Sequence, residues 1–196
     1  DRLAEEIPGG FKPNQYANMA NPQAHYDTTG PEIWEQTGGE LDALVIALGT
    51  GGTVSGISRY LKERKPDLVV VGADPEGSIY SQPDDVHPYL VEGIGEDFVP
   101  PNCDLSLVKK AYSISDKESF SAARDLLRKE GILAGSSSGT LLAAALRYCR
   151  EQSEPKRVVT LVCDTGAKYL SKVFNDAFIA QEGWLDREPT GTVRDV

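Results

Sequence analysis

The feature that most constrains this chain is a pair of short apolar runs on either side of a helical pattern. Residues 43–48 are apolar at every position, residues 68–73 nearly so, and an amphipathic stretch over 55–65 ends at Pro66. Strands that are buried on both faces have continuous apolar sequences, and they belong to parallel sheets covered by helices. The sequence therefore predicts a β-α-β unit with a right-handed crossover, the core of an α/β domain.

Further helices and strands are predicted on both sides of this unit. Towards the N-terminus, Asn21 is expected to cap a helix that starts with Pro22, and Gly30-Pro31 to separate it from a second helix over 32–36 that stops at Gly38. Beyond the unit, the patterns predict a strand at 111–114, helices at 116–130 and 140–151, a buried strand at 157–163 and a last helix around residue 169. Ser115 and Glu118 have the spacing of a capping box.

Composition excludes several classes of function. Thirty acidic and twenty basic residues give a net charge of -10, which argues against a nucleic-acid or anionic-membrane surface. The longest apolar runs span six residues, too few to cross a bilayer. The three cysteines form no CxxC pair, so neither a disulfide framework nor a zinc knuckle is indicated, and a reducing, cytoplasmic location is expected.

The strongest local signal is a glycine- and threonine-rich loop between the first apolar run and its helix. It consists of Gly49, Thr50, Gly51, Gly52 and Thr53. Backbone N–H groups at a helix N-terminus bind anions, and glycines let a phosphate approach closely. The loop lacks the lysine of a P-loop and the third glycine of GxGxxG, so it predicts a phosphate site of another type, with a tight structural turn as the alternative.

Two more polar loops follow later apolar segments. The first runs from Gly135 to Gly139 and contains Ser137, and on its own it is also explained as a helix N-cap. The second contains Asp164 and Gly166. Because ligands bind at the carboxyl ends of parallel strands, we expect all three loops to converge on one face of the sheet. The two histidines have no metal-ligand spacing and no GxSxG is present, so no metal site and no nucleophile elbow are predicted.

Taken together, the loop sequences resemble a known family. The segments are GTGGTVSG at 49–56, VEGIG at 91–95 followed by DFVP at 97–100, GILAGSSSG at 131–139, and VCDTG at 162–166. In this order they resemble the fold type II pyridoxal-phosphate (PLP) enzymes, and within these the group of cysteine synthases and cystathionine β-synthases. The resemblance covers residues 10–185, and its tail (FNDAFIAQEG, 174–183) favours the synthases that use homocysteine.

The resemblance implies a cofactor, a reaction and a set of site residues. The cofactor is pyridoxal 5'-phosphate, and the reaction is a β-replacement that condenses L-serine with L-homocysteine to cystathionine. The cofactor-binding residues would be Gly49, Thr50, Gly51, Gly52, Thr53, Ser137 (facing the pyridine nitrogen) and Asp164. The substrate-binding residues would be Gln15, Glu92, Gly93, Ile94, Gly95 and Asp97, with the loop 92–97 closing over the substrate. A homodimer is expected in this family.

Two features depart from the family pattern. Glu96 stands where animal and fungal members commonly carry a tyrosine, and the lysine that forms the Schiff base has no match in this chain. We expect that lysine upstream, in an N-terminal part of the catalytic core that acts as a partner, so no catalytic residue is assigned here. The expected organisation is the end of a small subdomain at 1–14, a large PLP-binding domain at 15–183 and a linker at 184–196.

Two alternatives remain open at this point. One is a cysteine synthase, which would use O-acetylserine and sulfide on the same fold. The other is a non-catalytic module that binds a phosphate-containing ligand.

Overall fold

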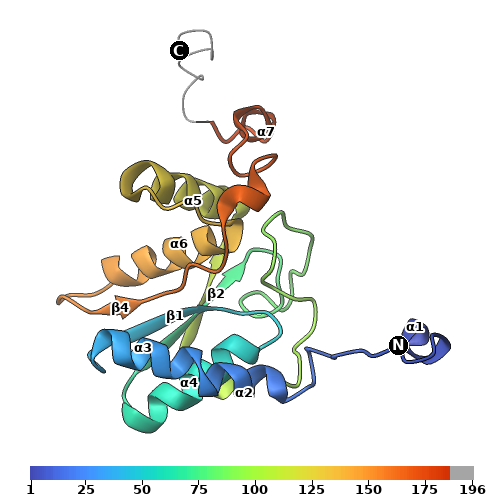
Figure 1. Cartoon of the computed structure of the whole chain (residues 1–196). Helices are drawn as coiled ribbons and strands as arrows, with labels where there is room; N and C mark the ends of the chain where they lie inside the picture. The colour runs from blue at the N-terminus through green and yellow to red at the C-terminus, as the bar shows by residue number, and fades with distance from the viewer. Residues whose placement is uncertain (186–196) are drawn as a thin grey trace.

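The computed structural model describes residues 1–185 of the chain (Figure 1). Its elements, in chain order, are α1 (Arg2–Glu6), α2 (Ala20–Asp27), α3 (Thr29–Thr37), β1 (Ala43–Ala47), α4 (Gly52–Arg64), β2 (Val69–Pro75), the 3₁₀ helix η1 (Leu105–Leu107), β3 (Lys110–Ile114), α5 (Asp116–Glu130), α6 (Ser136–Arg150), β4 (Val158–Val159), the 3₁₀ helix η2 (Gly166–Tyr169) and α7 (Asp176–Gln181).

The four strands form one parallel sheet in the order β3-β2-β1-β4. Ala43 of β1 lies opposite Val69 of β2 and Val158 of β4, and Val71 of β2 lies opposite Lys110 of β3. The predicted α/β fold with a mostly parallel sheet is confirmed.

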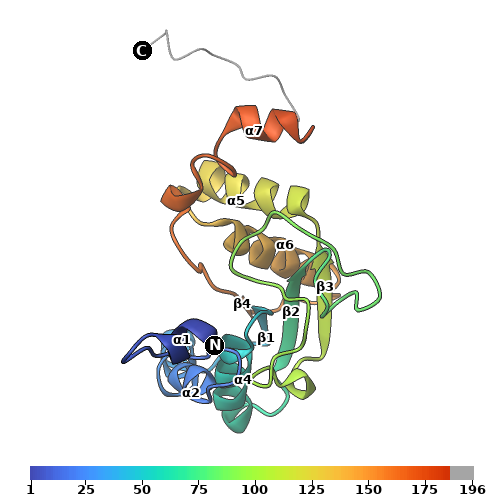
Figure 2. The same ribbon diagram turned by 90° about the vertical axis from the view of Figure 1, so that its right-hand side faces the viewer.

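Helices cover both faces of the sheet, and β1 is therefore buried on both sides. Leu44 and Ile46 belong to the apolar core that includes Ile57 of α4, whereas Val45 belongs to the core that includes Leu141 of α6. Figure 2 shows α6 and then α5 on one side of the sheet, with α4 and α2 on the other. This two-sided burial explains the continuous apolar run in the sequence.

Several predicted helix ends are corrected by the structure. Helix α2 begins at Ala20 with Met19 as its N-cap, so Asn21 is not the cap. Gly30 and Pro31 do not separate two helices but lie in the first turn of α3, where proline is tolerated because the first N–H groups have no intrahelical partner. Helices α4 and α6 begin at Gly52 and Ser136, so both glycine-rich loops extend into first helical turns.

Other helix ends match the sequence signals. Ser115 caps α5, and Ser115 and Glu118 form the reciprocal hydrogen bonds of a capping box. Gly131 and Gly38 end α5 and α3 in the left-handed conformation, with φ angles of 72° and 61°. These local patterns decide their own structure without help from distant contacts.

The predicted buried strand at 157–163 is largely wrong. Only Val158 and Val159 pair with β1, and both are partly exposed because β4 lies at the edge of the sheet. The chain then leaves the sheet, and the Cys163 N–H donates to Ser138 Oγ at 2.9 Å instead of to a neighbouring strand. An apolar run alone does not distinguish an edge strand from a central one.

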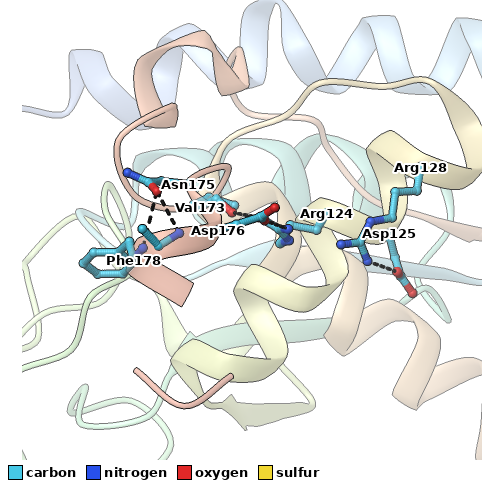
Figure 3. A network of polar contacts seen from close by, with 8 residues as sticks. Arg124, Asp125, Arg128, Val173, Asn175, Asp176 and Phe178 are labelled. Carbon is cyan, nitrogen blue, oxygen red and sulfur yellow. Dashed lines mark hydrogen bonds and ion pairs between the residues drawn. The ribbon is translucent and has the colours of Figure 1, made fainter. Parts of the chain in front are cut away.

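The last described segment packs on α5 instead of forming one helix around residue 169. The short η2 is followed by α7, whose N-cap Asn175 accepts hydrogen bonds from the backbone of Ala177 and Phe178. Arg124 of α5 donates to the Val173 carbonyl at 2.9 Å and forms an ion pair with Asp176 (Figure 3). The segment is therefore attached to the helix layer of the fold.

The N-terminal helix α1 has no buried residue and lies apart from the sheet (Figure 1). The proposed domain boundaries at 14/15 and 183/184 stay predictions, and most of the predicted linker at 184–196 lies outside the described residues. Within residues 1–185, no helix has the length and apolar character needed to cross a membrane.

Candidate functional site

The loops that follow β1 and precede α6 are joined by the segment 91–97. The Gly95 N–H donates to the Leu48 carbonyl at 2.7 Å, beside the first loop. The Glu92 N–H donates to Ser136 Oγ at 3.1 Å, in the second loop. The segment 91–97 therefore spans the carboxyl edge of the sheet between the two loops.

The third loop lies against the second. The Gly135 N–H donates to the Asp164 carbonyl at 3.1 Å, and Ala134 forms an isolated bridge with Thr165. These contacts confirm that the three polar loops converge on one edge of the sheet, as the strand-end rule for α/β folds predicts.

An open cleft of ≈ 530 Å³ lies over the first loop and the segment 91–97. The residues that line it are Gln15, Tyr16, Ala47, Gly49, Thr50, Gly51, Thr53, Gly93, Ile94, Gly95 and Glu96. Eight of the predicted site residues are among them. The structure does not place Gly52, Glu92, Asp97, Ser137 or Asp164 on the wall of this cleft.

The glycine loop presents free backbone donors to the cleft. Within the described residues, no protein acceptor is found for the N–H groups of positions 49–54, at the start of the 13-residue helix α4. Gly51 has a φ angle of 87°, and a Cβ there would lie 2.3 Å from the backbone of Cys103. Gly52 is buried, and a Cβ would lie 1.9 Å from Asn21 Oδ1. The loop is thus shaped for an anion, because its donors have no other use and its glycines admit no side chain.

Helix α2 orients the two threonine hydroxyls of the loop. Asn21 Nδ2 donates to Thr50 Oγ1 at 3.0 Å, which leaves the Thr50 O–H free to donate into the cleft. Thr53 Oγ1 lies 3.3 Å from His25 Nε2. Burial lowers the pKa of His25, so its ring is neutral at pH 7 and has one donor and one acceptor nitrogen. Sequence analysis missed these supporting side chains, since no local pattern links α2 to a loop 28 residues later.

The three serines at the start of α6 have different partners. Ser136 Oγ accepts from the Glu92 N–H and Ser138 Oγ accepts from the Cys163 N–H. Ser137 is 4% exposed. Its hydroxyl lies beside the Cys163 thiol and, within residues 1–185, makes no hydrogen bond to the backbone. The N-cap of α6 is Gly135, which removes the N-cap explanation for Ser137.

Asp164 is a half-buried carboxylate with one free oxygen. Its Oδ2 accepts from the Tyr169 hydroxyl at 3.0 Å and pairs with Lys168 Nζ at 3.3 Å. Its Oδ1 is buried and has no partner within the described residues. Burial is the main cause that raises the pKa of Tyr169 to about 12, and the neighbouring Asp164 carboxylate raises it further. The phenol therefore stays protonated.

Two predicted substrate-binding carboxylates, Glu92 and Asp97, do not line the cleft. Glu92 is exposed and forms an ion pair with Lys172 Nζ at 2.5 Å. Asp97 is exposed and lines a neighbouring cavity of ≈ 420 Å³ that also includes Tyr89 and Glu96. The Glu92 carboxylate is therefore occupied by Lys172, and Asp97 belongs to the second cavity.

Asn102 and Cys103 support the site from behind, which the sequence did not indicate. The Asn102 side chain is buried and donates to the carbonyls of Gln15 (2.8 Å) and Asn18 (3.1 Å). Cys103 lies directly behind Gly51. The turn 100–103 thus fixes both the glycine loop and the segment that carries Gln15.

Comparison with known proteins identifies the class of this fold and site. A family model described as "Pyridoxal-phosphate dependent enzyme" matches residues 1–164, so the chain belongs to the pyridoxal-phosphate-dependent enzymes. Their cofactor is pyridoxal 5'-phosphate, in agreement with the expectation from the sequence.

Individual relatives narrow the comparison. The cystathionine beta-synthase of Oryctolagus cuniculus is 42% identical over 198 residues, covering 98% of this chain and 36% of that protein. Cysteine synthase A of Escherichia coli K12 is 42% identical over 178 residues, covering 86% and 55%. The crystal structure of an O-acetylserine dependent cystathionine beta-synthase from Helicobacter pylori superposes with a TM-score of 0.81 at 42% identity, covering 87% of this chain and 56% of that one. The chain spans about a third of the length of the mammalian relatives.

The residues of this site fit the cofactor of the family. The unpaired N–H groups and threonine hydroxyls of the glycine loop suit a phosphate. Ser137 lies outside the cleft wall, and its neutral hydroxyl has the chemistry that suits a neutral ring nitrogen. Within residues 1–185, no group of three His, Cys, Asp or Glu side chains is arranged around a common metal position. The geometry therefore agrees with an organic phosphate cofactor held by neutral donors.

Proposed function

We propose that the protein containing this chain catalyses a PLP-dependent β-replacement in which the thiol of L-homocysteine replaces the hydroxyl of L-serine. The products are cystathionine and water. The observation that carries the proposal is the cleft that the glycine loop, with its unpaired N–H groups, lines together with Gln15 and the segment 93–96. The similarity to cystathionine beta-synthases over nearly the whole chain supports this choice.

Each part of the site has a role in this proposal. The backbone donors of residues 49–53 and the hydroxyls of Thr50 and Thr53 hold the phosphate, and Ser137 faces the pyridine nitrogen. When bound, the cofactor supplies the electron sink that lets the β-hydroxyl of serine be replaced by a thiol. Gln15 binds the substrate carboxylate, and Gly93, Ile94 and Gly95 cover the reacting groups and exclude water.

Of the five predicted residues that lie off the cleft wall, three are proposed to act indirectly. Asp164 supports the loop that carries Ser137, because its carbonyl accepts from the Gly135 N–H. Glu92 and Asp97 are proposed to act through the position of the segment 91–97, since neither lines the cleft. The Schiff-base lysine is proposed to belong to the upstream part of the protein, and the homodimer and cytoplasmic location also remain proposals.

A cysteine synthase is the second candidate. It is favoured by the 42% identity to cysteine synthase A and by the structural neighbour from Helicobacter pylori, an O-acetylserine dependent cystathionine beta-synthase. The two candidates differ in the leaving group of the first substrate and in the thiol, and both differences are measurable.

The test uses the purified full-length protein. Incubation with serine and homocysteine should give cystathionine, detected by mass spectrometry. Cysteine formed only from O-acetylserine and sulfide, with no cystathionine from any pair, would contradict the proposal. If cystathionine forms from O-acetylserine but not from serine, homocysteine is confirmed as the thiol substrate and O-acetylserine takes the place of serine as the first substrate. If the protein shows no visible absorption that borohydride removes, it holds no PLP on a lysine, and the non-catalytic module is favoured.

The phosphate assignment has its own prediction. Thr50→Val keeps the shape of the side chain but removes the hydroxyl, and we expect PLP to bind roughly tenfold to a hundredfold more weakly, because a hydrogen bond to a charged group contributes about 1.5–3 kcal/mol. PLP released after dialysis measures this. Thr37→Val is the matched control, since the Thr37 hydroxyl bonds only within α3. Equal PLP content in both variants would contradict the assignment.

A further inference from the structure

Glu96 is held rigidly at the end of the segment that covers the cleft. Its N–H donates to Ser78 Oγ at 3.0 Å, the Ser78 hydroxyl donates back to the Glu96 carbonyl at 3.2 Å, and the same carbonyl accepts from the Ile79 N–H at 2.9 Å. The preceding Gly95 has a φ angle of 80°, and a Cβ there would lie 2.4 Å from the Tyr89 hydroxyl. The backbone of Glu96 is therefore preorganised before any ligand binds.

Glu96 lines two cavities. It lines the cleft over the glycine loop, and it also lines the ≈ 420 Å³ cavity with Tyr89 and Asp97. Glu96 is thus shared by the linings of both cavities, and its carboxylate lies beside the hydroxyl of Tyr16, another residue of the cleft. The glycine loop supplies positive backbone dipoles on the other side of the cleft.

The Glu96 carboxylate has no cationic partner. Within residues 1–185, no Lys, Arg or His forms an ion pair with it, although twelve ion pairs occur elsewhere in this part of the chain. Its neighbours are the Tyr16 hydroxyl and the Asp97 carboxylate, and burial raises the pKa of Glu96. A partly buried carboxylate without a counter-ion, on the wall of a cleft, is suited to a ligand that brings a positive charge.

We propose that Glu96 binds the ammonium group of the thiol-bearing amino acid, the second substrate of the reaction. This inference rests on the proposed function, and it makes Glu96 a specificity-determining residue for homocysteine. The amino group of the first amino acid is engaged by the cofactor, whereas the second amino acid keeps a free ammonium. Sulfide carries no such group, so Glu96 has a use in cystathionine formation that it lacks in cysteine formation.

The experiment compares two thiols on the full-length holoenzyme with serine as co-substrate. Homocysteine carries an ammonium, and 4-mercaptobutanoate is the same molecule without it. In Glu96→Gln we expect kcat/KM for homocysteine to fall about tenfold or more, because a charge-assisted hydrogen bond is lost. The value for 4-mercaptobutanoate should change less than about twofold, and the KM for serine should stay constant. Glu96→Asp keeps the charge and should restore part of the homocysteine preference.

The outcomes separate this inference from the proposed function. Glu76→Gln is the matched control, because Glu76 is exposed and lines neither cavity. Equal losses for both thiols in Glu96→Gln, or no loss for either, would overturn the role of Glu96 while the wild-type enzyme still makes cystathionine. Absence of cystathionine with the wild-type enzyme contradicts the proposed function itself, and the role of Glu96 then fails with it.

Discussion

Three consecutive serines at the start of α6 show how neighbouring residues of one type acquire different tasks. Ser136 and Ser138 use their hydroxyls to fix two other loops, whereas the buried Ser137 hydroxyl has no backbone partner within the described residues. Its polar neighbour is the Cys163 thiol, a weak hydrogen-bonding group that leaves the hydroxyl able to bond to a ligand. A neutral hydroxyl at a pyridine nitrogen does not stabilise a protonated ring, which makes the cofactor a milder electron sink.

We therefore expect Ser137→Asp to slow turnover of the full-length enzyme about tenfold or more while PLP content is retained. The carboxylate would favour a protonated ring through a charge-assisted hydrogen bond, and this should also shift the visible absorption. Ser137→Ala should be milder, because a neutral hydrogen bond contributes about 0.5–1.5 kcal/mol. Turnover, spectra and melting temperature are measured together. Normal turnover with an unchanged spectrum in Ser137→Asp would remove Ser137 from the site.

At the scale of the elements, the end of β2 places a carboxylate in the core. Asp74 is fully buried, its Oδ2 accepts from the Ser81 N–H (2.8 Å) and hydroxyl (2.7 Å), and its Oδ1 has no partner within residues 1–185. Burial raises the pKa of Asp74, and the hydrogen bonds from Ser81 oppose this effect only in part. The folded state therefore favours the protonated form more than the unfolded state does.

This makes a prediction for stability against pH. A raised folded-state pKa means that the folded protein binds more protons, so the contribution of Asp74 falls as pH rises above about 4. The melting temperature of Asp74→Asn, relative to wild type, should therefore increase from pH 4 to pH 7. Asp42→Asn should show the opposite trend, because the Arg157 N–H lowers the pKa of Asp42. Parallel changes in both variants would refute the assignment.

Local patterns predicted the elements whose structure depends on local forces. The apolar run of β1, the capping box of Ser115 and the terminal glycine of α5 gave correct elements. Errors occurred where tertiary contacts decide: Asn21 bonds to Thr50 instead of capping α2, and the chain after Val159 bonds to α6 instead of continuing in the sheet. The convergence of the loops followed from topology, whereas Asn102, His25 and the direction of Glu92 depend on contacts that no sequence spacing records.

At the scale of the whole molecule, the C-terminal segment connects the helix layer to the segment 91–97, here called the cover of the cleft. One apolar cluster contains Phe120 of α5, Val173 and Ile179 of the C-terminal segment, and Val91 and Ile94 of the cover. The Lys172–Glu92 ion pair joins the same two segments. The position of the segment 91–97, and hence the closure of the cleft, therefore depends on how firmly residues 166–181 are attached to α5.

Arg124 is the main polar attachment of this segment, and its replacement tests the connection (Figure 3). Arg124→Leu keeps apolar contact with the helix layer but removes the bonds to Val173 and Asp176, at a cost of about 1–2 kcal/mol. Local opening should then increase roughly tenfold, and amide hydrogen exchange should accelerate both in 166–181 and in 91–95, with β1 unchanged. Arg128→Leu is the matched control, since Arg128 lies one turn further along α5 and, among residues 1–185, pairs only with the partly exposed Asp125. Faster exchange in 166–181 alone would show that the cover is held independently. No difference between the two variants would show that the apolar cluster suffices, because the polar contacts of Arg124 would then add nothing to the attachment.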